Sequence, residues 1–272
     1  MMPVVRGREK AASGVFFTVP ARGKPMVNLL PLEEGEKINA LLPVKQYDEQ
    51  HFIFMATRAG TVKKTPLTAF SRPRSNGIIA VDLADNDQLV GVALTDGERE
   101  IILVSSGGKA IRFHEREVRH MGREAAGVRG IRLGPGQDLI ALIVVGEGHV
   151  LTASAAGYGK LTPLEDFPAH GRGGQGVIAL QTSDRNGDTV AALQVMAGQE
   201  IMLISSTGTL VRTTVDEISV QGRNTQGVRL IRLDEGERLV GIERVESLDS
   251  AEEGASTGES AGSDAGEPAA DS

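Results

Sequence analysis

Basic side chains recur at two places in a unit of about 50 residues that is repeated along the chain. The first place follows a glycine after a short apolar run, and it holds Lys63 and Lys64, Lys109 and Arg112, Lys160, and Arg212. The second precedes another glycine, and it holds Arg22, Arg72 and Arg74, Arg123, Arg172, and Arg223. Evenly spaced ammonium and guanidinium groups can bind the phosphates of a polyanion by releasing counterions, a sequence-independent and salt-sensitive chemistry.

A structural explanation competes with this chemistry for the lysines. Lys63, Lys64, Lys109 and Lys160 fall on short strands at positions typical of sheet edges, where lysine prevents edge-to-edge aggregation. For a single lysine this explanation is the stronger one. Recurrence in four units, together with the arginine loops, favours a curved basic track.

The other candidate sites are weak. Gly171 to Gly176 satisfies G-x-G-x-x-G but precedes a strand rather than the helix that a dinucleotide site needs. Asp184 to Asp188 lacks the closing Glu of a calcium loop. The five histidines show no metal-ligand spacing, and we interpret Tyr47 and Tyr158 as structural rather than nucleophilic. We therefore expect no catalytic site, metal or cofactor in this chain.

Two series of glycines define the elements that carry the basic residues. Gly77, Gly127, Gly176 and Gly227 lie 50, 49 and 51 residues apart. Gly60, Gly108, Gly157 and Gly208, spaced 48, 49 and 51, each follow an apolar run. A glycine at such a join is typical of a tight hairpin, because it accepts positive φ without steric cost. Each unit is therefore predicted to contain about four short strands.

Units of this period and strand content are typical of blades around an axis. We predict an all-β, propeller-like domain of about five four-stranded blades. A closed ring and an open spiral are both compatible with the repeat. The strand after each glycine of the first series, such as the one after Gly227, is expected to run for about seven residues and to separate a basic rim from an acidic one.

Charge divides the chain into regions. The net charge is -7, and the segment from Asp249 to Ser272 holds seven acidic residues and no Lys or Arg. Such a composition buries too little apolar surface to fold. We predict a poorly structured remnant over residues 1–12, the β domain over 13–247 and an acidic disordered tail over 248–272. The absence of cysteine, of a signal-peptide pattern and of a membrane-length apolar run favours a cytoplasmic protein.

Several strings resemble the C-terminal domain of bacterial DNA gyrase A over Gly14 to Val245. They are Lys24 to Leu32, Phe54 to Thr57 with Gly60 to Thr65, Gly127 to Leu133, Gly157 to Lys160, and Gly222 to Val228. Two features depart from that family. The Q-[RK]-R-G-G-[RK]-G box is missing from the first blade, and the first blade is shortened.

The resemblance implies a β-pinwheel whose basic outer surface binds, bends and wraps double-stranded DNA for a type IIA topoisomerase during supercoiling. It also implies two protein partners, the gyrase A N-terminal cleavage core and the gyrase B protein. ATP and Mg would be needed only by the full parent enzyme, and the cleavage tyrosine belongs to a region outside this chain. We therefore expect an accessory domain, located in the cytoplasm with the nucleoid, that is no enzyme on its own.

The candidate phosphate contacts come from the hairpins and from the loops with their adjoining strands. They are Lys63, Lys64, Arg74, Lys109, Arg112, Arg123, Arg129, Lys160, Arg172, Arg212, Arg223 and Arg229. Two alternatives remain: the equivalent DNA-binding domain of topoisomerase IV, and a propeller that acts as a protein-interaction scaffold. The lack of Trp and of Trp-Asp signatures counts against the scaffold.

Overall fold

An antiparallel hairpin is the recurring element of the structure, a computed structural model that describes residues 42–44, 46–72 and 78–245. The first hairpin joins β1 (Phe52–Thr57) to β2 (Thr61–Pro66) through Gly60, whose φ is +80°. Gly108, Gly157 and Gly208 take the same left-handed conformation at the next three hairpins. The predicted role of this glycine series is confirmed.

Each hairpin lies in a separate antiparallel sheet. The remaining strands are β3 (Leu89–Thr95), β4 (Glu100–Ser105), β5 (Lys109–His114), β6 (Val128–Arg129), β7 (Leu139–Val144), β8 (His149–Ser154), β9 (Tyr158–Pro163), β10 (Val177–Ile178), β11 (Thr189–Val195), β12 (Glu200–Ser205), β13 (Leu210–Thr214), β14 (Val228–Arg229) and β15 (Leu239–Val245). In the described residues, a short 3₁₀ helix follows each hairpin: η2 (Leu67–Phe70), η3 (Glu115–Glu117), η4 (Leu164–Asp166) and η5 (Val215–Glu217).

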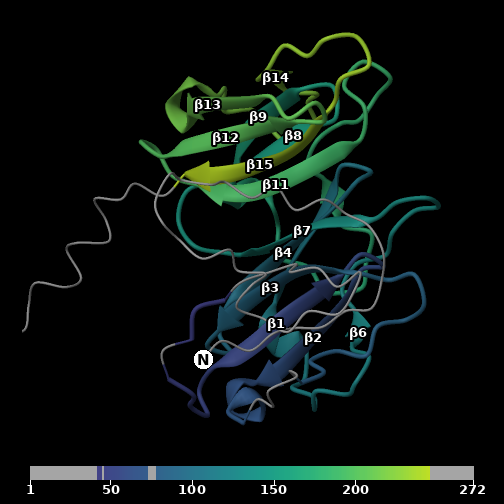
Figure 1. The fold of residues 1–272 in the computed structure, drawn as a ribbon, viewed down its shortest axis with the longest axis vertical. Helices are drawn as coiled ribbons and strands as arrows, with labels where there is room; N and C mark the ends of the chain where they lie inside the picture. The colour runs from purple at the N-terminus through teal and green to yellow at the C-terminus, as the bar shows by residue number, and fades with distance from the viewer. Residues whose placement is uncertain (1–41, 45, 73–77, 246–272) are drawn as a thin grey trace, which may run out of the picture.

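Three of the described sheets have four strands, in the orders β3-β1-β2-β6, β7-β4-β5-β10 and β11-β8-β9-β14, and the fourth has β15-β12-β13. The fourth strand of a sheet comes from the next repeat along the chain, so β6 joins the sheet of β1 and β2 although it lies between β5 and β7 in sequence. In Figure 1 the β1–β2 sheet lies at one end of the long axis and the β12–β13 sheet at the other, with β4 and β7 between them. Neighbouring blades are therefore interlocked by exchanged strands.

The exchanged strands are shorter than expected. The sequence predicted about seven residues after each glycine of the first series, and β6, β10 and β14 each have two. That prediction is wrong because each of these strands pairs with only two residues of the neighbouring hairpin before the chain turns away from the sheet. The glycines themselves are needed: Gly176 has φ +70°, and a Cβ there would lie 2.1 Å from the carbonyl oxygen of Ala110.

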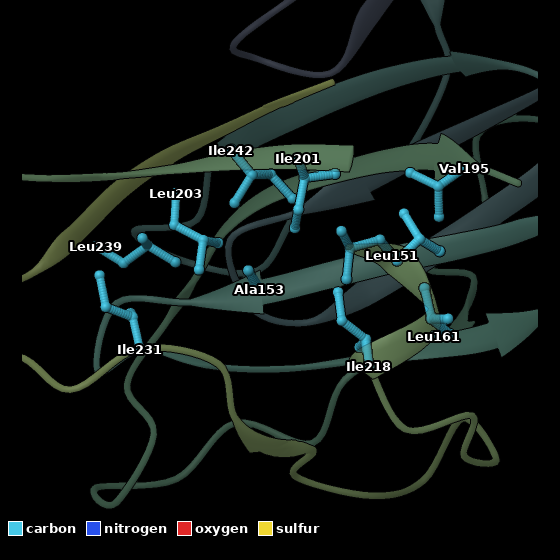
Figure 2. Packing of buried hydrophobic residues seen from close by; sticks show 11 residues of the cluster. Leu151, Ala153, Leu161, Val195, Ile201, Leu203, Ile218, Ile231, Leu239 and Ile242 are labelled. Atoms are coloured by element: carbon cyan, nitrogen blue, oxygen red, sulfur yellow. The ribbon is translucent and has the colours of Figure 1, made fainter. Parts of the chain in front are cut away.

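The hydrophobic core lies between successive sheets. In β4, Ile101 and Leu103 belong to the cluster shared with the β1–β2 sheet, whereas Ile102 and Val104 face the β8–β9 sheet. Because both faces are covered, the strand is apolar at consecutive positions. Figure 2 shows the next junction, where Leu151 and Ala153 of β8 pack against Ile201 and Leu203 of β12.

The all-β, propeller-like architecture predicted from the repeats is confirmed. The structure describes four sheets. The predicted fifth blade, the remnant at residues 1–12 and the tail at 248–272 lie outside the described residues. No helix within the described ranges is long and apolar enough to cross a membrane.

Candidate nucleic-acid interface

Lys63 and Lys160 occupy equivalent positions in β2 and β9, and both are buried. The Lys160 ammonium donates to the carbonyl oxygens of Gly222 (2.6 Å) and Arg223 (2.5 Å) and to Thr225 Oγ1 (3.0 Å). Lys63 donates likewise to the carbonyls of Ala80 (2.9 Å) and Arg123. Burial lowers the pKa of each lysine to about 8. Their predicted surface placement is wrong, because both side chains are buried and the ammonium groups donate to main-chain carbonyls.

Lys64 and Arg112 occupy the next equivalent positions and connect adjacent blades. Lys64, 6% exposed, donates to the carbonyl of Glu115 (3.0 Å) and lies 5.0 Å from the centre of the Phe52 ring. Burial lowers the Lys64 pKa, and Glu115 partly opposes that effect. These contacts contradict the predicted exposure of Lys64.

Arg112 makes the corresponding bridge between the second and third sheets. Its guanidinium donates to the carbonyls of Leu164 (2.9 Å) and Phe167 (3.2 Å) and pairs with Glu100. Only 19% of the side chain is exposed. Arg112 therefore lacks the exposed placement expected of a phosphate contact, because its donor groups face protein acceptors.

The arginine loops form a second set of connections. Arg123, Arg172 and Arg223 each donate Nη1–H to a main-chain carbonyl of the preceding repeat: that of Ile79 (3.0 Å), Arg129 (3.0 Å) and Ile178 (3.2 Å) respectively. The three acceptors are two residues beyond Gly77, Gly127 and Gly176. All three arginines are half-buried. Their recurrence thus has a structural cause, although Arg123 and Arg223 use one nitrogen each in these bonds.

Arg212 and Arg74 are two further residues of the predicted set of phosphate contacts. Arg212 is exposed and pairs with Glu200, the counterpart of the Arg112–Glu100 pair. Arg112 donates hydrogen bonds to the blade that follows its own. The blade that would follow that of Arg212 lies outside the described residues, so no equivalent acceptor can be named. Arg74 lies outside the described residues, so its role stays a prediction.

Lys109, Arg129 and Arg229 are brought to one equivalent position in three successive sheets. At the first rung beside each hairpin turn, Thr61 pairs with Arg129, Lys109 with Ile178, and Tyr158 with Arg229. Each rung therefore carries one cation, supplied by either strand. Arg129 and Arg229 are exposed and Lys109 is half-buried, with its ammonium 3.2 Å from Gln175 Oε1. We call these three residues the rung cations.

Neither Arg185 nor a binding role for Tyr158 was predicted from the sequence. The guanidinium carbon of Arg185 lies 4.8 Å from the centre of the Tyr158 ring, and that of Arg229 lies 5.6 Å from it. One signal was available: Thr189 follows Gly176 by 13 positions, whereas Leu139 and Leu239 follow Gly127 and Gly227 by 12. Within the described ranges, no group of three or more His, Asp and Glu residues is arranged to hold a metal ion.

Comparison with known proteins places the repeats in a family. The family model described as "DNA gyrase C-terminal domain, beta-propeller" matches residues 51–96, 99–146, 148–195 and 199–246. The DNA gyrase A protein of Pseudomonas aeruginosa is 50% identical over 92% of this chain, which spans 33% of that protein. The DNA gyrase A protein of Salmonella typhimurium is 56% identical over 83% of the chain, which spans 26% of it.

Two solved structures share the fold. A DNA gyrase A C-terminal domain aligns with a TM-score of 0.73 and 25% identity, over 82% of this chain and 75% of that one. The C-terminal domain of a DNA topoisomerase IV aligns with a TM-score of 0.79 and 26% identity, over 85% and 75%. The four interlocked sheets, the family match and the relatives at 50% identity or more agree: the chain belongs to the DNA gyrase A C-terminal β-propeller domain family.

Proposed function

We propose that this chain is a DNA-binding and DNA-bending domain without catalytic activity of its own, which serves a gyrase-type topoisomerase in supercoiling. The observation that carries the proposal is the rung cations. Lys109, Arg129 and Arg229 share one ladder position in three consecutive blades. The blades of a propeller are arranged around an axis, so DNA that contacts this position in successive blades would bend.

The electrostatics of the rung cations suit phosphate rather than protein carboxylate. Among the described residues, no carboxylate oxygen lies within 4 Å of the charged groups of these three side chains. Their charge is therefore available to an external anion. Each phosphate neutralised would release counterions and contribute about 0.9 to the slope of log K against log salt.

The other predicted residues divide between two roles. The half-buried loop arginines Arg123, Arg172 and Arg223 would be secondary contacts, because guanidinium N–H groups remain beyond those bonded to carbonyls. Arg212 would contact DNA only by giving up Glu200. Lys63, Lys64, Arg112 and Lys160 would hold the blades in place and contact no phosphate.

The parent assembly follows from the relatives. The curated relatives are DNA gyrase A proteins of which this chain spans about a third or less, so a cleavage core would lie in the part of those proteins that it does not match. A gyrase B protein would be a separate partner. We propose that the domain presents bent DNA to that core in the cytoplasm. No cofactor is expected here, and ATP and Mg would act in the parent enzyme alone.

A topoisomerase IV domain is the second candidate, since such a domain aligns with a TM-score of 0.79. The two solved structures do not separate the candidates, since their identities to this chain are 25% and 26%. The support for gyrase comes from the two gyrase A proteins named above, at 50% and 56% identity. DNA wrapping and DNA bending differ in the writhe that they impose on the DNA. A domain that wraps DNA should trap writhe in a closed circle, whereas a domain that only bends DNA should not.

The test is plasmid relaxation by a type I topoisomerase in the presence of the chain, paired with binding to linear duplex DNA across a salt series. We expect salt-dependent binding and a shifted linking number. Binding without a linking-number shift would favour the topoisomerase IV alternative. Absent or salt-independent binding would overturn the DNA proposal and favour a protein scaffold.

A further inference from the structure

The turn before β11 has a basic residue, Arg185, at a position where the equivalent turns have no basic residue. Counted back from the following strand, Arg185 corresponds to Asp85, Pro135 and Glu235. Two of those counterparts are acidic, and the sequence pattern marks this segment as an acidic turn. The third turn is also the one with an additional residue.

Buried hydrogen bonds hold this turn against the exchanged strand. Asn186 is fully buried, and its Nδ2 donates to the carbonyl oxygens of Gln181 (2.9 Å) and Gln226 (3.3 Å). Its Oδ1 accepts from the main-chain N–H of Ser183 (2.8 Å). Gln226 is three residues before Arg229, so the turn that carries Arg185 and the strand that carries Arg229 are fixed relative to each other.

The two guanidiniums meet at one phenol. Tyr158 is 7% exposed, Arg229 Nη2 donates to its hydroxyl oxygen at 3.1 Å, and both arginines lie within 6 Å of its ring centre. Arg185 and Arg229 are exposed, and no carboxylate of the described residues pairs with either. Asp184 and Asp188 instead line a neighbouring cavity with Glu237 and Arg238.

Two cations on one neutral ring repel each other unless an anion lies between them. Guanidinium is the group best suited to bind phosphate oxygens, because its N–H groups form a planar fork. The phenol hydroxyl adds a third polar group at the same place. The direction of the Tyr158 pKa agrees: the guanidinium of Arg229, which donates to the hydroxyl, and then that of Arg185 hold the pKa below its ordinary value of 10.0.

We propose that Arg185, Arg229 and Tyr158 form a phosphate site that takes one backbone phosphodiester of DNA. The site rests on the proposed function for its ligand, and it makes the third described blade different from the others. Thr61 and Lys109 replace Tyr158 at the equivalent rungs, so those blades offer one cation where this blade offers two. DNA would therefore be held most firmly at this blade.

A first experiment tests the anion chemistry without DNA. In a Tyr47→Phe background, Tyr158 is the one remaining tyrosine of the chain, so its ionisation can be followed by ultraviolet absorbance. Inorganic phosphate, compared with chloride at equal ionic strength, should raise the Tyr158 pKa by neutralising the guanidiniums. The rise should disappear in Arg185→Ala and persist in Arg238→Ala, an exposed arginine of the following turn. No rise in the parent protein would overturn the site.

A second experiment uses a duplex of about 20 base pairs. Arg185→Ala should weaken binding roughly tenfold, equivalent to about 1.4 kcal/mol, and lower the salt slope by about 0.9. Arg238→Ala should change neither quantity. If Arg185→Ala binds like the parent while loss of Lys109 and Arg129 weakens binding, the site is refuted and the proposed function stands. If phosphate shifts Tyr158 but the parent binds no DNA, the anion site stands and its DNA role falls.

Discussion

The buried ammonium of Lys160 makes stability depend on pH in a way that can be measured. Burial lowers its pKa in the folded protein to about 8, from an ordinary value of 10.5. Between these values the unfolded chain binds more protons than the folded one, so the free energy of unfolding rises with pH. The contribution of Lys160 is therefore least favourable below pH 8 and improves up to about pH 10.5.

The magnitude follows from linkage. The difference between about 8 in the folded protein and 10.5 in the unfolded chain corresponds to roughly 3 kcal/mol of unfolding free energy over the whole window. Between about pH 7.5 and about pH 9.5 the expected share is about 2 kcal/mol. In Lys160→Met this term is removed, so the unfolding free energy of the wild type minus that of the variant should grow by that amount.

Urea unfolding of both proteins at the two pH values gives this difference directly. Ile111→Met is the matched control, because Ile111 is the buried counterpart of Lys160 in the neighbouring blade and has no titratable group. Its difference from the wild type should be the same at both pH values. A pH-independent difference for Lys160→Met, or one that shrinks at high pH, would refute the assignment of a desolvated ammonium.

Two further changes test how the blades are held together. Gly176→Ala should lower the free energy of unfolding by more than about 3 kcal/mol, because the new Cβ meets the Ala110 carbonyl. Gly136→Ala, at the same φ of +70° but in open space, should lower it by about 1–2 kcal/mol. Equal losses in thermal unfolding would contradict the role of that contact. Arg112→Ala should lower the free energy of unfolding by about 2–3 kcal/mol, because it removes the hydrogen bonds to the carbonyls of Leu164 and Phe167. Arg212→Ala removes only an exposed ion pair with Glu200 and should lower it by less than about 1 kcal/mol. Similar chemical-unfolding midpoints for the two arginine variants would contradict the interblade bridge.

The sequence was sufficient for the strands because their signals are local. A glycine at a hairpin needs positive φ, and an apolar run such as Ile101 to Val104 requires two covered faces, so both features could be predicted from residue type and spacing. Strand exchange is not local. Val128 pairs with Val62 rather than with its own repeat, and the repeat period is the same for either pairing.

The basic residues show the same limit at the level of single side chains. Lys63 and Lys109 look alike in sequence, yet the first donates to buried carbonyls and the second lies at an outer rung. The difference lies in their position along the strand, since Lys63 is the third residue after the glycine of its hairpin and Lys109 is the first. The carbonyls that Lys63 contacts come from elsewhere in the chain, and sequence alone does not show where they lie. Arg129 and Arg229 show the opposite outcome to Lys63, because both lie on short exchanged strands and the structure leaves both exposed.

The most direct test of the DNA track is the salt dependence of binding after the rung cations are removed. In Lys109→Ala/Arg129→Ala/Arg229→Ala, the slope of log K against log salt should fall by about 2.7, three contacts at about 0.9 each. The control Arg99→Ala/Arg116→Ala/Arg238→Ala removes the same charge from exposed positions elsewhere and should keep the parent slope. Equal slopes for the two triple variants would contradict the account, because DNA would then respond to net charge and not to the rungs.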